Sequence, residues 1–370
     1  ANISDQVKAH EVRLSYTIPV DGNLDNPSNK ATGAMVWVED DLGTRTDFIE
    51  QGPGLYISPA TFAGEAGRKY ALFIITSEGK RYQSSFEELV AAPEVSKIYH
   101  RFSFVTPDQS AIQLPGLQFF IDVENAGQST QFYRYEISDT HQVKVPYPKQ
   151  WQYIRNGNAP GIIIPFNEDV EECYREQSYN DLVLATSTIN ENSELKEVPV
   201  KFVAASQLDV TTFYSLEVTQ RAISAEAYSY YRKLELFNES NGTLFDKQQG
   251  TLTGNVVSID SPDEKVLGYF EVSGANSTRM FLGTYDFDRR IFQYINSTCG
   301  RYSPIEYDGT MEAFYLAQDL PLSERAEEIA IRSVYDLYYF DQNSERKYLA
   351  HRLCTDCTRS GSPIKPDYWP

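Results

Sequence analysis

The sequence predicts a mainly all-β protein with two domains, and three observations lead to this prediction. Aromatic residues are abundant, with 26 Tyr and 20 Phe, and such residues favour the pleated surface of a sheet. Apolar residues alternate with polar ones in several segments, which is typical of half-buried strands. Turns that contain glycine separate these segments at spacings of about ten residues, which is typical of an antiparallel sandwich.

The first domain is expected at residues 1–93, as an immunoglobulin-like β-sandwich. Its clearest strand lies in EVRLSYTIPV, where every second residue from Val12 to Val20 is apolar or aromatic. Further strands are expected in AMVWVED, GTRTDFIEQ, GLYISP and RKYALFIIT. The alternation breaks at EELVAAPEVSK, and we therefore place a domain boundary near residue 93.

The second domain is expected at residues 94–370, as a larger β-rich domain with one amphipathic helix near 224–238 and a cysteine-containing tail. Ser224 is a plausible N-cap, and Glu226 lies in the first turn of this helix. Apolar residues at helical spacing follow, and we expect them to pack in a core rather than to bind a ligand: Ala227, Tyr230, Tyr231, Leu234 and Phe237. The segment ERAEEIAIRSVYDLYYF (324–340) is ambiguous between helix and strand.

Charge and motifs exclude several classes of function. The net charge is -19, and no run of basic residues is longer than two, which argues against nucleic acid as a partner. No stretch reaches the roughly 18 apolar residues that a membrane helix needs. The sequence contains no G-x-S-x-G elbow, no P-loop and no G-x-G-x-x-G fingerprint. We therefore expect a protein that is not an enzyme and that binds neither a cofactor nor a catalytic metal.

Four cysteines are present: Cys173, Cys299, Cys354 and Cys357. A redox C-x-x-C motif should follow a strand and open a helix, whereas Cys354-x-x-Cys357 precedes Ser, Gly and two prolines. A zinc ribbon would need a second C-x-x-C, although His351 leaves a His-Cys-Cys set open. An even number of cysteines in a β-rich chain favours disulfides in an oxidising compartment.

The pairing of the cysteines is open at this point, because four cysteines allow three connectivities. Their spacing makes Cys354 and Cys357 one candidate pair, which leaves Cys173 for Cys299. The alternative connects the tail back to Cys299.

Several segments resemble, in order, a Bacteroidota family of outer-membrane lipoproteins that is known only as a domain of unknown function (DUF4249). They are VRLSYT, GAMVWVED, GPGLYISP and GKRYQSS, then ECYRE, YSLEVTQRAISAEAYSYYRKL, GTLFDKQQGTLTGNV, VLGYFEVSG and the tail CTDC with KPDYW. Members begin with a lipoprotein signal and a lipidated Cys. The present chain starts at ANISD, so the resemblance implies a lipid anchor upstream of Ala1.

The resemblance implies a lipid-anchored protein at the outer membrane, exposed on the cell surface. Such proteins are commonly encoded beside a TonB-dependent receptor of the SusC type. The implied function is therefore that of a non-enzymatic accessory or ligand-capturing subunit of such a barrel. The alternative is a secreted adhesin or structural β-sandwich protein without a transporter. The resemblance also implies that the C-x-x-C motif acts as a disulfide staple, because outer-membrane proteins fold where disulfides persist.

An accessory subunit must bury aromatic and apolar area against its partner, because interfaces are enriched in such residues. Two aromatic, Pro-containing segments are expected as loops: VPYPKQWQYIRNGNAPGIIIPF (145–166) and KPDYWP (365–370). The candidate contact residues in them are Tyr147, Trp151, Tyr153, Tyr368 and Trp369. The alternative is that these segments fold back onto their own domain, and for the tail we favour that alternative.

Overall fold

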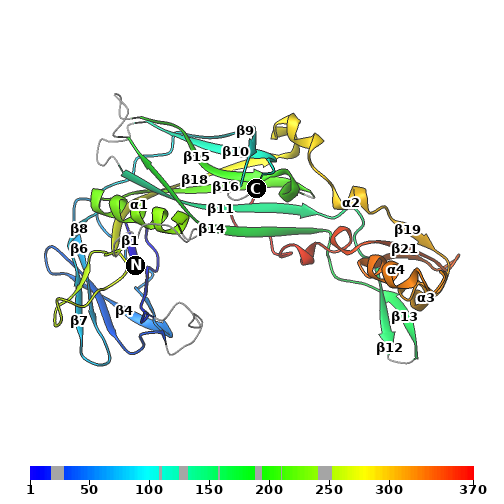
Figure 1. Ribbon diagram of the computed structural model, residues 1–370, viewed down its shortest axis with the longest axis horizontal. Helices are drawn as coiled ribbons and strands as arrows, with labels where there is room; N and C mark the ends of the chain where they lie inside the picture. The colour runs from blue at the N-terminus through cyan, green and yellow to red at the C-terminus, as the bar shows by residue number, and fades with distance from the viewer. Residues whose placement is uncertain are drawn as a thin grey trace.

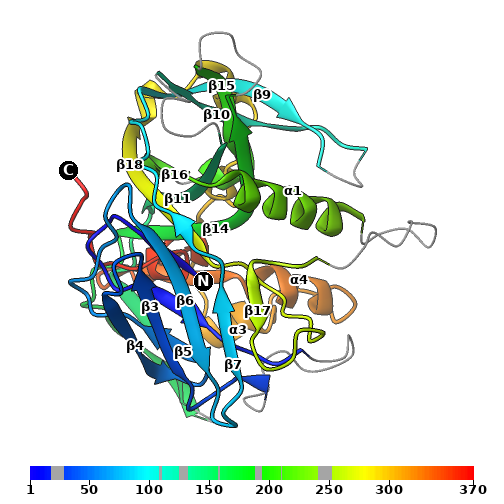
Figure 2. The same ribbon diagram turned by 90° about the vertical axis from the view of Figure 1, so that its left-hand side faces the viewer.

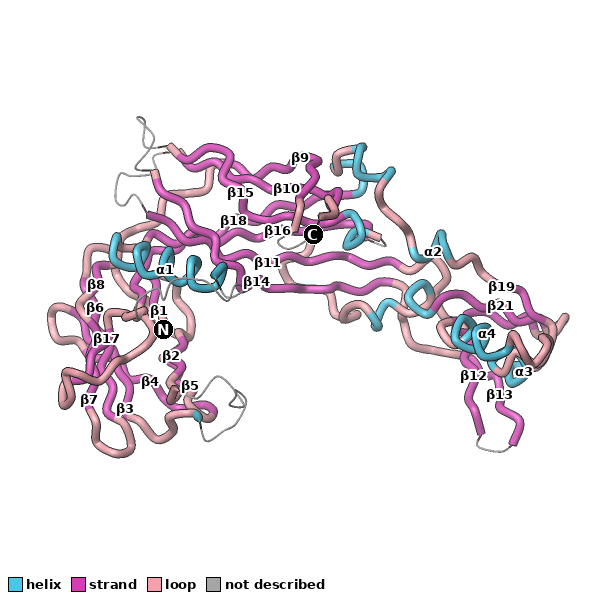
Figure 3. Tube along the Cα trace, in the orientation of Figure 1, coloured by secondary structure: helices cyan, strands magenta, loops and turns pink. Residues whose placement is uncertain are grey.

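The computed structural model describes residues 1–17, 29–107, 111–124, 132–156, 159–187, 194–209, 211–240 and 252–370. Figure 1 shows an elongated molecule with an N-terminal unit at one end, a central unit of long strands and a distal unit at the other end. Strands make up most of the trace (Figure 3). The predicted all-β fold class is confirmed. The end of the first predicted strand, Ile18 and Val20, lies outside the described residues.

The N-terminal unit is a curled antiparallel sheet around an apolar core, which also contains Ile3 and Val272 from strands of the central unit. Its strands are β2 (Glu11–Arg13), β3 (Met35–Asp40), β4 (Arg45–Gly52), β5 (Leu55–Ile57), β6 (Lys69–Ile75), β7 (Arg81–Ser84) and β17 (Val256–Ser258). They follow the order β17-β7-β6-β3-β4-β5-β2, and β4 pairs with both halves of the sheet. Because side chains alternate along a strand, Val36, Val38 and Phe48 all lie in the enclosed core.

The first sheet ends close to the expected boundary. The short strand β8 (Glu87–Glu88) pairs with β6, and the next sheet begins at β9 (Lys97–Val105). The segment between them is docked on the central unit, because Gly274 donates a backbone hydrogen bond to Val90 at 2.9 Å. A Cβ at Gly274 would lie 2.2 Å from the same carbonyl oxygen, so only glycine permits this approach. That residues 1–93 form an independent domain stays a prediction, since β17 comes from much later in the chain.

The central unit packs two sheets against each other. One contains β1 (Asn2–Ser4), β18 (Glu271–Gly283), β16 (Thr211–Ala222), β11 (Phe132–Lys144) and β14 (Glu172–Thr186), in this order. The other contains β15 (Leu195–Ala204), β10 (Leu114–Val123) and β9. Their inner faces share one core that includes Phe119, Tyr135 and Tyr214. Short 3-10 helices adjoin these sheets: η2 (Ala205–Leu208), η3 (Thr284–Asp286) and η4 (Arg289–Gln293).

The predicted helix is confirmed as α1 (Ala225–Ser240), which lies beside the central sheet (Figure 2). Ser224 caps it, since its hydroxyl accepts a hydrogen bond from the backbone N–H of Ala227 at 3.1 Å. The tyrosines at its start pack against Ile223 and Tyr269, as expected for core residues. Within the described residues, no helix combines the length and the apolar character needed to cross a membrane.

The distal unit has its own small core at the end of the long strands. It contains the hairpin β12 (Trp151–Asn156) and β13 (Ala159–Pro165), a sheet of β19 (Ile305–Tyr307), β21 (Arg346–His351) and β20 (Tyr335–Asp341), and the helices α2 (Thr298–Arg301), α3 (Met311–Tyr315) and α4 (Arg325–Arg332). The ambiguous segment 324–340 is therefore a helix followed by a strand. Met311, Phe314 and Leu349 are buried in the core of this unit.

A buried ion cluster lies where the N-terminal and central units meet. Glu271 is fully buried and accepts hydrogen bonds from the Arg134 guanidinium at 2.8 and 2.9 Å. The Glu136 carboxylate forms ion pairs with the guanidinium groups of Arg134 and Arg221, with nitrogen–oxygen distances of 3.1 and 2.8 Å. Burial alone would raise the pKa of Glu271, but the charge and hydrogen bonds of Arg134 outweigh it and lower this pKa to about 2.

We expect Glu271→Ala to lower the free energy of unfolding by about 3 to 5 kcal/mol, because Arg134 would be left buried without its main partner. Since the Glu271 carboxyl has a depressed pKa, its contribution to stability is full above pH 4.5 and is lost as the pH falls towards 2. Urea unfolding as a function of pH measures both effects. The control is Glu306→Ala, in the exposed pair with Arg346, where less than about 1 kcal/mol is expected. Equal losses in the two variants would refute the assignment.

Candidate partner-binding site

The aromatic segment 145–166 was expected to be a loop, and this expectation is wrong. The structure forms the antiparallel hairpin β12–β13 there, with Trp151 opposite Pro165 and Ile154 opposite Ile162. Both strands of a two-stranded sheet are edge strands. Such strands tolerate proline, because the backbone N–H groups on their outer side form no hydrogen bond within the sheet. The run of three isoleucines at 162–164 supplies the β-branched residues that favour a strand.

The two faces of this hairpin have different environments. Trp151, Tyr153 and Ile163 lie on the inner face and pack against the core of the distal unit. Ile154 and Ile162 lie opposite each other on the outer face, where they are 42% and 54% exposed. The predicted contact residues Trp151 and Tyr153 therefore serve packing. If the segment is interpreted as a strand, the alternation of its side chains identifies Ile154 as the exposed candidate for partner contact.

Tyr153 is fixed by three neighbours. Its hydroxyl donates a hydrogen bond to the Glu312 carboxylate, and the backbone N–H of Gly161 donates to the same oxygen at 2.6 Å. Its ring stacks on Tyr315 at 6.2 Å. Burial and the neighbouring Glu312 charge together raise the pKa of Tyr153 to about 12. A Cβ at Gly161 would lie 2.4 Å from the Tyr153 ring, so a larger residue at this position would have to displace that ring.

Tyr147 joins the base of the hairpin to the C-terminal turn. Its backbone N–H donates to the carbonyl oxygen of Cys354 at 3.0 Å. Its half-buried ring lies 5.4 Å from the ring of Tyr338. Tyr147 therefore lies inside the distal unit and contributes little free surface to a partner.

The distal unit nevertheless exposes many large apolar side chains. They come from the hairpin, from α3 and α4 with the loop between them, from β20 and from the C-terminal turn: Ile154, Ile162, Leu316, Leu322, Ile329, Ile331, Tyr339 and Leu353. Leu322 is the most exposed of them, at 82%. Contiguous exposed apolar patches are typical of protein–protein contacts, and among these residues Ile154 and Ile162 are direct neighbours across the hairpin.

The tail folds back onto the central sheet, as the alternative for this segment predicted. Trp369 is only 7% exposed and packs against Tyr174, Phe213 and Phe281, with ring centroids 5.3 to 5.7 Å away. The prediction that Trp369 contacts a partner is therefore wrong, because these three rings already enclose its indole. Tyr368 is 40% exposed, and the Arg279 guanidinium lies 3.7 Å from the centre of its ring.

Both cysteines of the C-x-x-C motif are in disulfides, but not with each other. Cys173 of β14 pairs with Cys357, and Cys299 of α2 pairs with Cys354. The pairing of Cys354 with Cys357, favoured by spacing, is wrong, whereas the link from the tail to Cys299 is present. The two residues belong to separate turns, η5 (Arg352–Cys354) and η6 (Cys357–Arg359), each facing a different partner. Within the described part of the chain, no group of His, Cys, Asp and Glu could hold a metal ion.

A buried polar network in the central unit has the residue types of a catalytic triad. His141 lies 3.0 Å from the Thr211 hydroxyl and 3.6 Å from the Asp139 carboxylate. The hydroxyls of Tyr179 and Tyr214 donate to the same Asp139 oxygen at 2.8 and 3.0 Å. Thr211 and His141 are 8% and 1% exposed, and both lie between the two packed sheets of the central unit. The Oδ2 atom of Asp139 accepts both tyrosine hydrogen bonds, whereas its Oδ1 atom has no hydrogen-bond partner within the described residues. Contacts that converge on one buried carboxylate fit a structural polar network of the core better than a nucleophile and its base.

Comparison with protein families gives a match to the family described as "Domain of unknown function (DUF4249)", over residues 1–279. The chain belongs to this family. The DUF4249 match covers the N-terminal unit, the hairpin β12–β13 and most of the central unit, and it ends within β18. Three of the four cysteines lie beyond it. A search of curated proteins finds no match.

We expect peptide mapping without reductant to link the peptide of Cys173 to that of Cys357, and Cys299 to Cys354. Cleavage on the N-terminal side of Asp356 separates Cys354 from Cys357, so the two connectivities give different masses. The Cys173–Cys357 and Cys299–Cys354 disulfides close loops of 184 and 55 residues. If a disulfide acts by lowering the entropy of the unfolded chain, they add about 5 and about 4 kcal/mol to the free energy of unfolding. A fragment pair joined only through Cys354 and Cys357 would contradict the structure.

Trp369→Ala is expected to lower the free energy of unfolding by about 3 to 5 kcal/mol, because it removes a large buried ring from an aromatic cluster. The matched control is Tyr285→Ala, since Tyr285 is 99% exposed. Less than about 0.5 kcal/mol is expected there. Urea unfolding of both variants measures the difference, and an unchanged midpoint for Trp369→Ala would show that the tail is free.

Proposed function

We propose that this DUF4249 protein is a non-enzymatic, surface-exposed outer-membrane lipoprotein that works as an accessory or ligand-capturing subunit of a SusC-type, TonB-dependent barrel. Family membership supports the proposal, together with the resemblance to Bacteroidota lipoproteins that are encoded beside such receptors. In the alternative, the protein is a secreted adhesin or a structural β-sandwich protein, and no barrel protein binds it in stoichiometric amount.

The observation that carries the proposal is the exposed apolar pair Ile154 and Ile162 on the outer face of the projecting hairpin. In water, exposing such side chains is unfavourable by about 25 cal/mol per Å² of apolar area. The buried centre of an interface is enriched in apolar side chains and depleted of charges. A barrel partner that covers this face would remove the apolar area from water.

The disulfides and the position of the N-terminus support the proposed location. Disulfides persist in oxidising compartments such as the periplasm and the cell surface, and this chain has two that close long loops. Ala1 lies in the same half of the molecule as the N-terminal unit, far from the distal unit (Figure 1). A lipid anchor attached upstream of Ala1 would therefore hold the N-terminal side at the membrane and leave the hairpin free to reach a partner.

The double variant Ile154→Ser, Ile162→Ser is expected to reduce the amount of barrel protein that co-purifies in mild detergent by at least about tenfold, since two apolar contacts of about 1 to 2 kcal/mol each would be lost. Its thermal midpoint should stay within about 2 °C of the parent, because both side chains face solvent. Mass spectrometry of the purified complex provides the measurement.

The matched control is Leu42→Ser, Ile49→Ser, which removes two side chains of 78% and 65% exposure from the N-terminal unit. This control should retain the barrel protein. If no barrel protein accompanies the parent protein in stoichiometric amount, the adhesin or structural alternative is favoured. Equal loss in both double variants would refute the assignment of the hairpin.

A further inference from the structure

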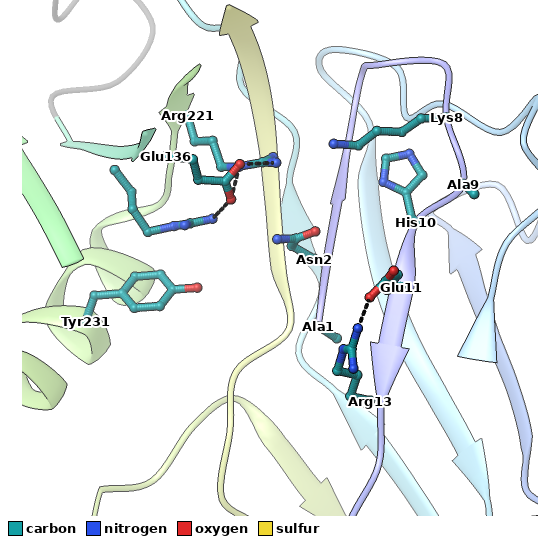
Figure 4. A pocket seen from close by; sticks show the side chains of 11 residues that line it. Ala1, Asn2, Lys8, Ala9, His10, Glu11, Arg13, Glu136, Arg221 and Tyr231 are labelled. Carbon is teal, nitrogen blue, oxygen red and sulfur yellow. Dashed lines mark hydrogen bonds and ion pairs between the residues drawn. The ribbon is translucent and has the colours of Figure 1, made fainter. Parts of the chain in front are cut away.

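A polar cavity of about 480 Å³ lies between the N-terminal and central units. Figure 4 shows Lys8, His10 and Arg13 on the side of the N-terminal unit and Glu136 and Arg221 on the opposite side. Small-molecule sites in proteins commonly have volumes of about 300 to 1,000 Å³. The cavity is thus large enough for a solute of a few carbon atoms that touches both units.

The side-chain charges around this cavity balance, apart from one. Arg134 and Arg221 are neutralised by Glu271 and Glu136 in the buried ion cluster. Arg13 pairs with Glu11 at 2.7 Å. Among the residues that the structure describes, Lys8 forms no ion pair, and in Figure 4 its ammonium points across the cavity. Burial and then the nearby Arg221 charge lower the pKa of Lys8, and the more weakly acting Glu136 carboxylate only partly opposes them.

His10 supplies a second group without a partner. Its side chain is 1% exposed, and neither ring nitrogen has a hydrogen-bond partner within the described residues. Burial, followed by the Lys8 charge, lowers the pKa of His10 to about 4, so the ring is neutral at pH 7. Backbone groups of Gln6 and Phe62 lie near the ring and act in the opposite direction, but neither reaches hydrogen-bond geometry with a ring nitrogen. A neutral imidazole keeps one N–H donor. A buried donor without a partner is unfavourable, and a bound acceptor would offset this.

We infer that this cavity binds a small polar solute that carries a carboxylate or a phosphate group. The anionic group would pair with the Lys8 ammonium and accept a hydrogen bond from the His10 ring. Hydroxyl or amide groups of the same solute would meet the guanidinium and carboxylate groups of Arg221 and Glu136, which suits a polar solute better than an apolar one. Charge-assisted hydrogen bonds of this kind are about twice as strong as neutral ones.

The inference goes beyond the proposed function and does not depend on it. The cavity lies at the junction with the N-terminal unit, whereas the proposed partner face lies on the distal unit at the other end of the molecule (Figure 1). Solute binding is measured with the purified chain alone, and barrel association is measured by co-purification. If no solute binds, the result for barrel association is unaffected, and the reverse also holds.

The test is calorimetric titration of the protein with sodium phosphate and, separately, with sodium succinate, each at a total ionic strength matched with sodium chloride. Saturable binding of at least one of the two anions is expected, and the comparison decides between phosphate and carboxylate. Lys8→Gln should weaken that binding at least tenfold, whereas Lys8→Arg should restore most of it because the charge remains. The control Lys80→Gln removes an exposed lysine that pairs with Glu78 and should bind as the parent does.

His10→Gln gives an independent reading, because it removes the imidazole without changing the net charge at pH 7. Weaker binding with an unchanged ionic-strength dependence is expected. The inference is overturned if neither anion binds saturably, or if Lys8→Gln and Lys80→Gln bind alike. It is also overturned if Lys8→Arg binds no better than Lys8→Gln, since the charge would then have no part in binding.

Discussion

Two disulfides hold the C-terminal turn, and the position of the distal unit depends on them. Cys357 ties the turn to the long strand β14 through Cys173, while Cys354 ties it to α2 through Cys299. The base of the hairpin rests on the same turn, since Lys149 donates a backbone hydrogen bond to Thr355 at 2.9 Å. A unit with so few buried residues gains little from its own core, and cross-links are a common means of stabilising such small units.

The opposite end of the molecule is held by segments that lie far apart in the sequence. β1 pairs in parallel with β18, and β17 completes the first sheet by pairing with β7. The buried carboxylate of Glu271 and the guanidinium of Arg134 lie where these segments meet. Together these contacts make the N-terminal and central units interdependent, and the polar cavity lies along their boundary. A solute bound there would contact both units and favour one relative orientation of them.

Local patterns predicted what depends on local sequence. Alternation identified the strands around Val36 and Leu72, and Ser224 with the apolar spacing after it located α1 to within two residues. The hairpin was missed because its prolines indicated a loop, although in a two-stranded sheet they disturb little. The disulfide pairing and the burial of Glu271 depend on contacts between residues that are 55 to 184 positions apart. Spacing along the chain carries no information on such contacts.

The central claim is that the outer face of the hairpin β12–β13 meets a barrel protein at the cell surface. The most direct measurement is photo-cross-linking in living cells, with a photoreactive amino acid in place of Ile162 and, as the matched control, in place of Ile49. The account predicts that illumination joins the Ile162 variant to one large outer-membrane barrel protein and leaves the Ile49 variant free. An adduct formed from position 49 alone, or none from either position, would contradict it.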